Sequence, residues 1–109
     1  MIDRSASSPD ISVVVPVHDE SGAAVPLARE IAEAFVGRSY EMIFVNDASR
    51  DSTLAELQAA MAELPALRVL SHGANAGQSR AVRTGVLAAR APIVVTLDGD
   101  GQNPPRSEE

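Results

Sequence analysis

Apolar residues gather in four short runs along the chain, at residues 11–17, 41–46, 67–70 and 93–97. The runs are rich in Val, Ile and Leu, and polar residues, Gly or Pro separate them. Runs of this length and composition are typical of β-strands. The first is almost continuously apolar, which favours a parallel strand covered on both faces over a half-exposed one. We therefore predict four strands in a parallel sheet.

Apolar residues at helical spacing fill the first interval between these runs. Leu27, Ile31 and Phe35 recur every four residues, so they share one face of a helix. Gly37 follows as a residue that commonly ends helices. The pattern predicts a helix that buries this face and ends at Gly37.

A second helix is predicted in the next interval. Thr53 and Glu56 fit a capping box at its start, and Pro65 ends it. Its buried stripe is expected to consist of apolar residues three or four positions apart: Leu54, Leu57, Met61 and Leu64.

A third helix is predicted before the last apolar run. Val82, Val86 and Ala89 are expected to line its buried face. Gly85 lies on the same helix, where the absence of a side chain lets the helix approach the sheet closely.

The alternation of strands and helices indicates the fold class. Strand–helix–strand crossovers, each right-handed, give an α/β protein with a parallel sheet and helices on its faces. We predict the strand order 3-2-1-4, because the chain must reverse direction across the sheet for the fourth strand to pair with the first. This order places Asp19 and Glu20 near Asp98. The predicted architecture is a nucleotide-binding-like half-domain with four strands and three helices.

Composition restricts the partners of this chain. It has 109 residues, enough for one domain, with a formal net charge of -6 and a sequence pI of about 4.8. The acidic balance argues against a nucleic-acid surface, which needs clustered Lys and Arg. The absence of Cys excludes disulfides and thiolate metal sites. Residues 1–10 are polar, and we expect a flexible leader there, before a single domain at residues 11–109.

Acidic side chains follow three of the four predicted strands: Asp19 and Glu20, then Asp47, then Asp98 and Asp100. In an open parallel sheet these positions meet at one edge, where ligands bind. Carboxylates that repel one another at such an edge are stabilised by a cation or by hydrogen-bond donors of a ligand. A nucleoside diphosphate with its metal ion supplies both.

The end of the fourth predicted strand concentrates this chemistry. Asp98 and Asp100 alternate with Gly99 and Gly101, and glycine allows the break in strand geometry that lets two carboxylates converge on one cation. Oxygen ligands of this kind suit Mg²⁺ or Mn²⁺. The alternative for this segment alone is a solvated Asp-Gly turn after a buried strand.

The other polar residues at this edge are less distinctive. Asp47 has the length and acceptor character to take hydrogen bonds from a base edge or a ribose. His18 has no catalytic partner in the sequence and fits a polar loop residue, and we assign no role to His72. Neither a Gly-x-Gly-x-x-Gly motif nor a Walker motif is present, which argues against dinucleotide-binding and P-loop sites.

Two other classes of function fit an acidic rim. A receiver-like regulatory module also places carboxylates at strand ends and holds Mg²⁺, but it is expected to carry a Lys at the last strand, and this chain has none there. A phosphotransferase with Asp98 as nucleophile more often has its Asp pair after the first strand. We rank both below a nucleotide-dependent transferase.

Four motifs, taken in order, resemble those of the family 2 inverting glycosyltransferases. They are Val-Pro-Val-His-Asp-Glu at residues 15–20, Val-Asn-Asp-Ala-Ser-Arg-Asp-Ser-Thr at 45–53, Asn-Ala-Gly-Gln at 75–78 and Leu-Asp-Gly-Asp-Gly-Gln-Asn-Pro-Pro at 97–105. The resemblance is closest to the dolichyl-phosphate mannosyltransferase-like branch and other polyprenyl-phosphate sugar transferases. It implies the GT-A fold, a Rossmann-like sheet.

The resemblance also implies roles for individual residues. The residues that it places at the nucleotide are Pro16, His18, Asp19, Glu20, Asp47 and Asp98, with Asp47 at the base. The residues that it places at the metal, Mg²⁺ or Mn²⁺, are Asp98, Asp100 and Gln102.

This chain departs from the family pattern at two places. The family usually has Tyr-Asn where His18 and Asp19 stand, and often Lys where Gln78 stands. Arg80 or Arg83 on the third predicted helix is a candidate for the missing positive charge near phosphate. The alternative, that both are surface arginines, fits equally well.

The implied reaction is transfer of a sugar, with inversion, from a UDP- or GDP-linked donor to a lipid phosphate acceptor. The chain stops just after the metal motif, so we expect a truncated donor-binding half that is inactive alone, with any catalytic base beyond residue 109. We expect its fourth strand to be an exposed apolar edge that promotes self-association. The expected location is the cytoplasm, or the cytoplasmic face of the membrane for a full-length protein.

Overall fold

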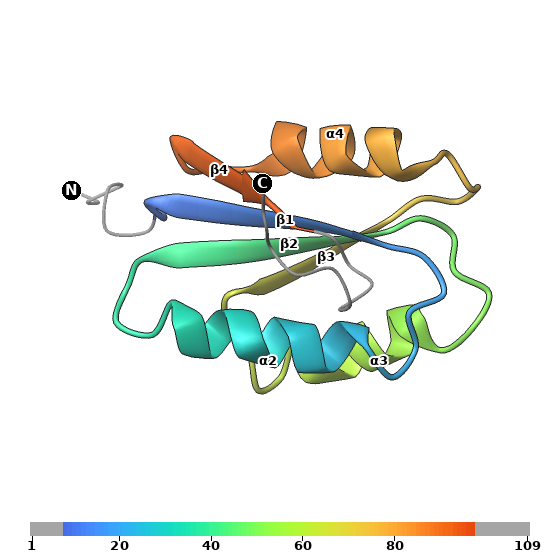
Figure 1. Cartoon of the computed structure of the whole chain (residues 1–109), viewed down its shortest axis with the longest axis horizontal. Helices are drawn as coiled ribbons and strands as arrows, with labels where there is room; N and C mark the ends of the chain where they lie inside the picture. Colours follow the sequence, from blue (N-terminus) through green and yellow to red (C-terminus); the bar gives the residue numbers. More distant parts are fainter. Residues whose placement is uncertain (1–7, 98–109) are drawn as a thin grey trace, which may run out of the picture.

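Strands and helices alternate along residues 8–97, the part of the chain that the computed structural model describes (Figure 1). In chain order the elements are β1 (Ile11–Val17), α2 (Ala24–Ala34), β2 (Tyr40–Asn46), α3 (Thr53–Ala60), β3 (Leu67–Ser71), α4 (Gln78–Ala88) and β4 (Ile93–Thr96). This is the order of elements that the apolar pattern predicts.

The strands form one parallel sheet in the order β3-β2-β1-β4. The predicted order 3-2-1-4 is therefore confirmed. β1 and β2 pair over their full length, from Ile11 opposite Tyr40 to Val17 opposite Asn46. β4 pairs only with the first part of β1 and forms a short edge strand.

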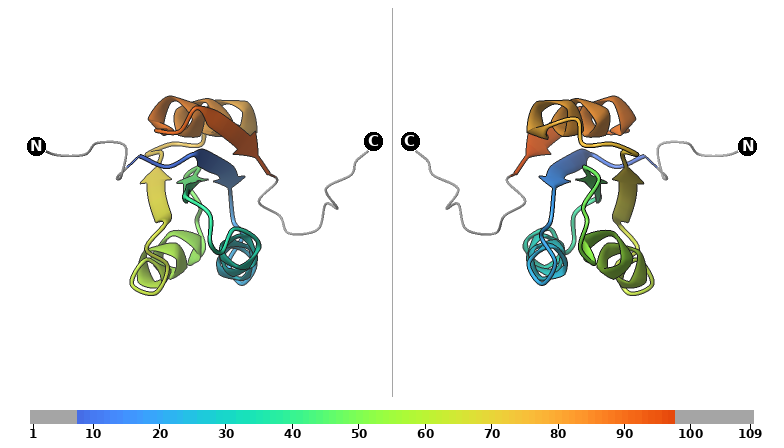
Figure 2. Two further views of the ribbon diagram at one scale, coloured as in Figure 1. Left: turned by 90° about the vertical axis from the view of Figure 1, so that its left-hand side faces the viewer. Right: turned by 90° about the vertical axis from the view of Figure 1, so that its right-hand side faces the viewer.

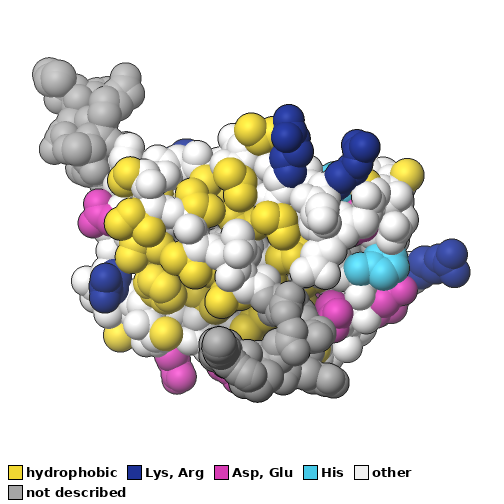
Figure 3. Space-filling view, turned by 45° about the horizontal axis from the view of Figure 1, so that its top comes forward, with side chains coloured by type: hydrophobic (Ala, Val, Ile, Leu, Met, Phe, Trp, Pro, Cys, Tyr) yellow, Lys and Arg dark blue, Asp and Glu magenta, His cyan; other side chains and the backbone are white. Residues whose placement is uncertain are grey.

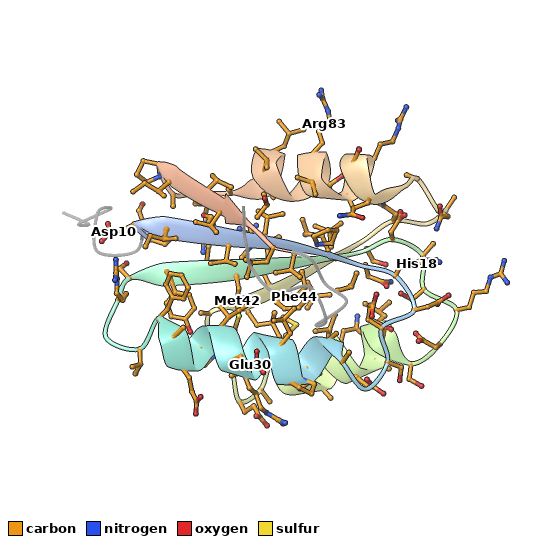
Figure 4. The ribbon with its side chains drawn as sticks, in the orientation of Figure 1. Asp10, His18, Glu30, Met42, Phe44 and Arg83 are labelled. Carbon is orange, nitrogen blue, oxygen red and sulfur yellow. The ribbon has the colours of Figure 1, made fainter. Side chains whose placement is uncertain are left out.

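Helices cover both faces of the sheet, with α2 and α3 on one face and α4 on the other (Figure 1, Figure 2). The larger core lies between the sheet and the α2–α3 layer, and Met42 and Phe44 point into it from β2 (Figure 4). A smaller core contains Ile43, Val45 and Ala81 of α4. Successive residues of a strand face opposite ways, so the continuous apolar run of β2 buries both faces of the sheet.

α4 approaches the sheet closely at Gly85. A Cβ at this position would lie 2.4 Å from Val14 Cγ1 and 3.2 Å from Val45 Cγ2. Only glycine fits without displacing these two buried side chains. The prediction that Gly85 allows a close approach is confirmed.

The first predicted helix face is confirmed, and so is its end. Ile31 is buried, and Leu27 and Phe35 are half-buried against the same core. Gly37 takes a left-handed φ of 82° just beyond the helix, a conformation that costs glycine little.

The buried faces predicted for the second and third helices are each wrong at one residue. Met61 is 42% exposed and lies beyond α3, which ends at Ala60, before the proline that was expected to stop it. Val86 is also 42% exposed, whereas Ala81 is fully buried against the sheet. The physical reason in α4 is the close approach of the helix, which leaves room at the contact for Ala and Gly and turns larger residues outward.

A buried carboxylate ties the sheet together at its N-terminal end. Glu41 of β2 accepts hydrogen bonds from Ser12 Oγ of β1 at 2.6 Å and from Arg68 Nη1 of β3 at 2.8 Å. It also accepts bonds from the backbone N–H of Arg90 at 2.8 Å and from Arg90 Nε at 3.1 Å. Burial alone raises the pKa of Glu41, but the bonds from Ser12, Arg90 and Arg68 hold it below its ordinary value.

The outer side of β4 pairs with no strand among the described residues. Ile93 is 56% exposed, Val94 and Val95 are each 37% exposed, and Leu87 of the neighbouring α4 is 73% exposed. Figure 3 shows hydrophobic side chains gathered on this face of the molecule. Within residues 8–97, no helix combines the length and the apolar character needed to cross a membrane.

The predicted leader, residues 1–10, lies mostly outside the described residues. At its described end, Pro9 is buried and the backbone N–H of Asp10 donates to Ser39 O at 3.0 Å. The chain is thus already attached to the domain just before β1 begins.

Candidate functional site

The loops that leave the C-terminal ends of the strands lie at one edge of the sheet, the edge at which His18 is labelled in Figure 4. The loop after β1 contributes His18, Asp19 and Glu20, the loop after β2 begins at Asp47, and the loop after β3 begins at His72. This is the convergence of polar residues that the strand order predicts.

The loops after β1 and β2 are joined by hydrogen bonds. The backbone N–H of Asp19 donates to Ser49 Oγ at 2.9 Å, and the backbone N–H of Arg50 donates to Asp19 Oδ1 at 2.7 Å. Asp19 and Ala48 both have positive φ, 52° and 58°. Non-glycine residues adopt this region at a cost and usually where surrounding contacts hold them. The two loops therefore form one fixed wall of the site.

Thr53 and Asp51 extend this connection toward α3. The backbone N–H of Glu20 donates to Thr53 Oγ1 at 2.8 Å, and that hydroxyl donates in turn to Asp51 Oδ1 at 2.5 Å. Asp51 Oδ2 accepts the backbone N–H of Ser21 at 3.0 Å. These bonds, led by the one from the Thr53 hydroxyl, lower the pKa of Asp51.

The predicted capping box of Thr53 and Glu56 is wrong. The residue at the N-cap of α3 is Ser52, with no side-chain capping bond. Glu56 instead accepts Ser21 Oγ at 2.7 Å and the backbone N–H of Gly22 at 3.0 Å, and these bonds lower its pKa. The physical reason is that the loop after β1 offers donors that compete with the N–H groups of the helix itself.

Among residues 8–97, Asp47 is the most enclosed carboxylate at this edge, with its side chain 5% exposed. Its Oδ1 accepts the backbone N–H of Ala76 and the Nδ1–H of His72, both at 2.8 Å, and its Oδ2 accepts the backbone N–H of Gly77 at 2.8 Å. Burial by itself raises the pKa of Asp47, but the bonds from His72, Ala76 and Gly77 outweigh it and lower the pKa. Asp47 is thus a charged group that anchors the loop before α4.

His72 is the residue that sequence reasoning missed. Besides donating to Asp47, its ring places Nε2 2.8 Å from Thr84 Oγ1 of α4. Its side chain is 19% exposed. Its place directly after a strand put it at the correct edge, but no spacing in the sequence indicates that Asp47 and Thr84 meet there.

His18 lies beside Asp47 as a more open residue. Its Nδ1 is 2.7 Å from the backbone carbonyl oxygen of Asp47, so that nitrogen carries the donated proton. Asn75 Nδ2 lies 3.3 Å from the same ring, and the side chain of His18 is 42% exposed. Pro16, two residues before His18, is buried within β1.

The predicted metal ligands Asp98, Asp100 and Gln102 lie outside the described residues. Two carboxylates and an amide form a donor set of hard oxygen atoms, which fits Mg²⁺ or Mn²⁺. Among residues 8–97, no group of three or more acidic or His side chains is placed to hold a metal ion.

The two candidate arginines of α4 are both exposed. Figure 4 shows Arg83 projecting from the side of α4 that faces away from the sheet. That direction favours the surface interpretation of Arg83.

Comparison with known proteins identifies the family. The model of glycosyl transferase family 2 matches residues 12–108. The dodecaprenyl-phosphate galacturonate synthase of Rhizobium johnstonii is 36% identical over 100 residues, which cover 89% of this chain and 30% of that protein. The undecaprenyl-phosphate 4-deoxy-4-formamido-L-arabinose transferase of Pseudomonas paraeruginosa is 40% identical over 99 residues, which cover 87% of this chain and 29% of that protein.

Solved structures agree with the sequence comparison. The mannosyltransferase PcManGT of Pyrobaculum calidifontis, in complex with GDP-Man and Mn²⁺, superimposes with a TM-score of 0.77 at 26% identity, over 85% of this chain and 28% of that one. S. aureus TarS in complex with UDP-GlcNAc gives a TM-score of 0.75 at 25% identity, over 84% of this chain and 26% of that one. The sheet has the GT-A arrangement of these enzymes. The chain thus spans about three-tenths of the length of the curated relatives above, and it belongs to glycosyl transferase family 2.

Proposed function

We propose that this chain forms the donor-binding part of a glycosyltransferase that moves a sugar from a UDP- or GDP-linked donor to a polyprenyl phosphate. The observation that carries the proposal is the family match over residues 12–108, combined with the fixed polar edge at the ends of β1, β2 and β3. The relatives named above act on polyprenyl phosphates, and the neighbouring structures hold GDP-Man or UDP-GlcNAc.

In this proposal the nucleotide lies against the wall made by the loops after β1 and β2. His18 is exposed enough to contact a base or ribose, and the Asp47 carboxylate has an Oδ2 that accepts only one bond, from Gly77, among the described residues. Asp19 and Glu20 shape the same wall through their backbone bonds to Ser49 and Thr53.

Asp98, Asp100 and Gln102 are proposed to hold a divalent metal, Mg²⁺ or Mn²⁺. Such an ion would neutralise the charge that develops on a leaving nucleoside diphosphate. In the proposed reaction an oxygen of the acceptor phosphate bonds to the anomeric carbon from the opposite face while the bond from that carbon to the nucleoside diphosphate breaks, which inverts the configuration. A phosphate acceptor needs no general base, whereas a hydroxyl acceptor does.

We propose further that residues 1–109 bind the donor without transferring the sugar. Transfer requires donor and acceptor to be held together, and such positioning is worth roughly 7–11 kcal/mol of the barrier. The described loops supply a wall for the donor, and the chain spans about three-tenths of the relatives that carry out the whole reaction. An assay of radiolabelled sugar transfer to a polyprenyl phosphate tests this, and turnover by this chain would contradict it.

The donor site is tested by titration with nucleotides. UDP and GDP are added with Mg²⁺ while backbone amide shifts are followed, and Mn²⁺ is then used for paramagnetic broadening. We expect coupled shifts at Asp47 and Asp98, and broadening centred on residues 98–102. Asp100→Asn is expected to weaken the metal dependence, because it removes one charged ligand.

Asp10→Asn is the matched control for this titration. Asp10 lies at the opposite end of the sheet from His18 (Figure 4), so its charge removal is expected to leave nucleotide binding unchanged. Amides that stay silent with every nucleotide, or broadening centred elsewhere, would exclude the proposed site.

A further inference from the structure

We propose that His72 is a positioning residue of the donor site, which holds the Asp47 carboxylate and the loop of residues 73–77 in the arrangement that receives a nucleoside diphosphate. This inference rests on the proposed function and adds a residue to it. Three observations carry it: the two-sided bonding of the His72 ring, the enclosure of Asp47, and the contact between the loop and His18.

The His72 ring bridges two elements that are otherwise separate in the chain. Its Nδ1 is 2.8 Å from Asp47 Oδ1 at the end of β2, and its Nε2 is 2.8 Å from Thr84 Oγ1 in the middle of α4. A carboxylate only accepts, so Nδ1 carries a proton, and in the neutral ring Nε2 accepts the proton of the Thr84 hydroxyl. His72 therefore fixes the carboxylate against the helix.

The Asp47 carboxylate transmits this constraint to the loop. It accepts the backbone N–H groups of Ala76 and Gly77, the two residues that lead into α4. Gly77 has a φ of 98°, so the loop turns sharply where the carboxylate holds it. A rotation of Asp47 would release both N–H groups at once.

The loop in turn meets the open part of the proposed site. Asn75 Nδ2 lies 3.3 Å from the His18 ring, and His18 Nδ1 bonds to the Asp47 backbone oxygen. Asp47 thus has its carboxylate held by His72 and its carbonyl held by His18. Loss of the His72 bond is expected to move Asp47, Asn75 and His18 together, and Asp47 and His18 are proposed to face the nucleotide.

A matched pair of substitutions separates this role from simple packing. In His72→Asn the side-chain amide nitrogen takes the place of Nδ1, so the bond to Asp47 is kept and the bond to Thr84 is lost. In His72→Gln the amide reaches the place of Nε2, so the bond to Thr84 is kept and the bond to Asp47 is lost. Both variants retain a polar side chain and each removes one bond.

The test measures the dissociation constants of UDP and GDP with Mn²⁺ by calorimetry, together with thermal unfolding and hydrogen exchange at the Ala76 and Gly77 amides. We expect His72→Gln to weaken binding about tenfold, as for the loss of a hydrogen bond to a charged group. His72→Asn is expected to stay within about threefold of the wild type. Faster exchange at both amides is expected only in His72→Gln, at comparable melting temperatures.

Each outcome decides the inference. Two results would overturn it and leave the proposed function standing. The first is equal nucleotide affinity in His72→Gln and the wild type. The second is a loss of affinity in both variants that is proportional to their loss of melting temperature. A wild-type chain that binds neither UDP nor GDP would overturn the proposed function and this inference with it. If His72→Gln fails to fold, His72→Ala replaces it, because it also removes the bond to Asp47. We then expect weaker nucleotide binding in His72→Ala than in His72→Asn, and equal affinities in these two variants would overturn the inference.

Discussion

Strand β2 carries a buried carboxylate at each end, and the two have different roles. Glu41 at its start joins three strands and the segment before β4, while Asp47 just after its end holds the loop before α4. Both have lowered pKa values although burial alone raises them, because hydrogen-bond donors surround each one. A buried charge is tolerated in a small domain only with such donors.

The first prediction concerns Glu41→Gln. A neutral amide cannot satisfy the donors of Arg68 and Arg90 as a carboxylate does, and breaking a buried charged network costs about 2–4 kcal/mol. Chemical denaturation at neutral pH is expected to show a loss of this size. Glu33→Gln on the exposed surface of α2 is the control, and its stability is expected to be unchanged.

The contribution of Glu41 to the free energy of unfolding is expected to depend on pH. The folded-state pKa of Glu41 lies below its ordinary value of 4.5. Its stabilising contribution is therefore fully present above that value and is lost as the pH falls through the folded-state pKa. The difference in unfolding free energy between the wild type and Glu41→Gln is expected to shrink between about pH 5 and pH 3. A difference that stays constant over this range would contradict the assignment.

Thr53 is a fully buried polar residue that holds the loop after β1. Its hydroxyl accepts the N–H of Glu20 and donates to Asp51. Thr53→Val keeps the shape and removes both bonds, so we expect a loss of about 1–2 kcal/mol and faster hydrogen exchange at the Glu20 amide. Thr53→Ser keeps the hydroxyl and is the control. Equal exchange rates in both variants would show that the hydroxyl does not hold the loop after β1.

At the scale of elements, Gly85 determines how closely α4 lies to the sheet, because it has no side chain. Ala81 and Gly85 face the sheet, so the helix lies close to β1 and β2, and the larger Val86 and Leu87 are exposed. This packing fixes Thr84, one turn of the helix from Ala81, opposite His72. The position of the candidate site thus depends on how closely α4 approaches the sheet.

Substitution of Gly85 tests this dependence. Gly85→Ala gains helix propensity worth about 1 kcal/mol, but its Cβ would lie 2.4 Å from Val14 Cγ1. Valine is stiff at χ1, so we expect a net loss of about 1–3 kcal/mol from overpacking. Gly73→Ala is the control, because a Cβ there meets nothing within 4 Å. Equal unfolding free energies for Gly85→Ala and the wild type would contradict the close approach.

At the scale of the whole molecule, the apolar face of β4 and α4 is uncovered among the described residues. Ile93, Val94 and Val95 lie on an edge strand, and an exposed apolar edge is a template for pairing with another chain. We propose that residues 1–109 self-associate in solution through this strand. Leu87 offers a second apolar contact, on the helix rather than on the edge.

Lysine substitutions distinguish the two modes of association. Ile93→Lys is expected to give a monomer at concentrations at which the wild type is larger, because a charge on the edge opposes strand pairing. Leu87→Lys is expected to leave the association in place if the chains associate by strand pairing. Val36→Lys is the control, because Val36 is 79% exposed and lies in the opposite layer. The masses are measured by light scattering over a range of concentrations. A wild type that remains monomeric throughout would contradict self-association.

The sequence by itself determined the order of the elements, the strand order and the edge that carries the polar residues. Those features follow from apolar periodicity and from the rule that parallel strands end at one edge, both of which are local or topological. The family was also readable, because its motifs are contiguous. Asp19, Glu20 and Asp47 were placed correctly at the edge by the same reasoning.

Only the tertiary structure decided which side chains bond to one another. Thr53 and Glu56 looked like a capping pair because their spacing is local, yet the loop after β1, more than thirty residues earlier, supplies the donors that they bind. His72 had no motif, because its partners Asp47 and Thr84 lie on two other elements. Val86 was assigned to a buried face because periodicity does not report how closely a helix approaches a sheet. Contacts between distant elements depend on distances that are fixed only when the elements pack.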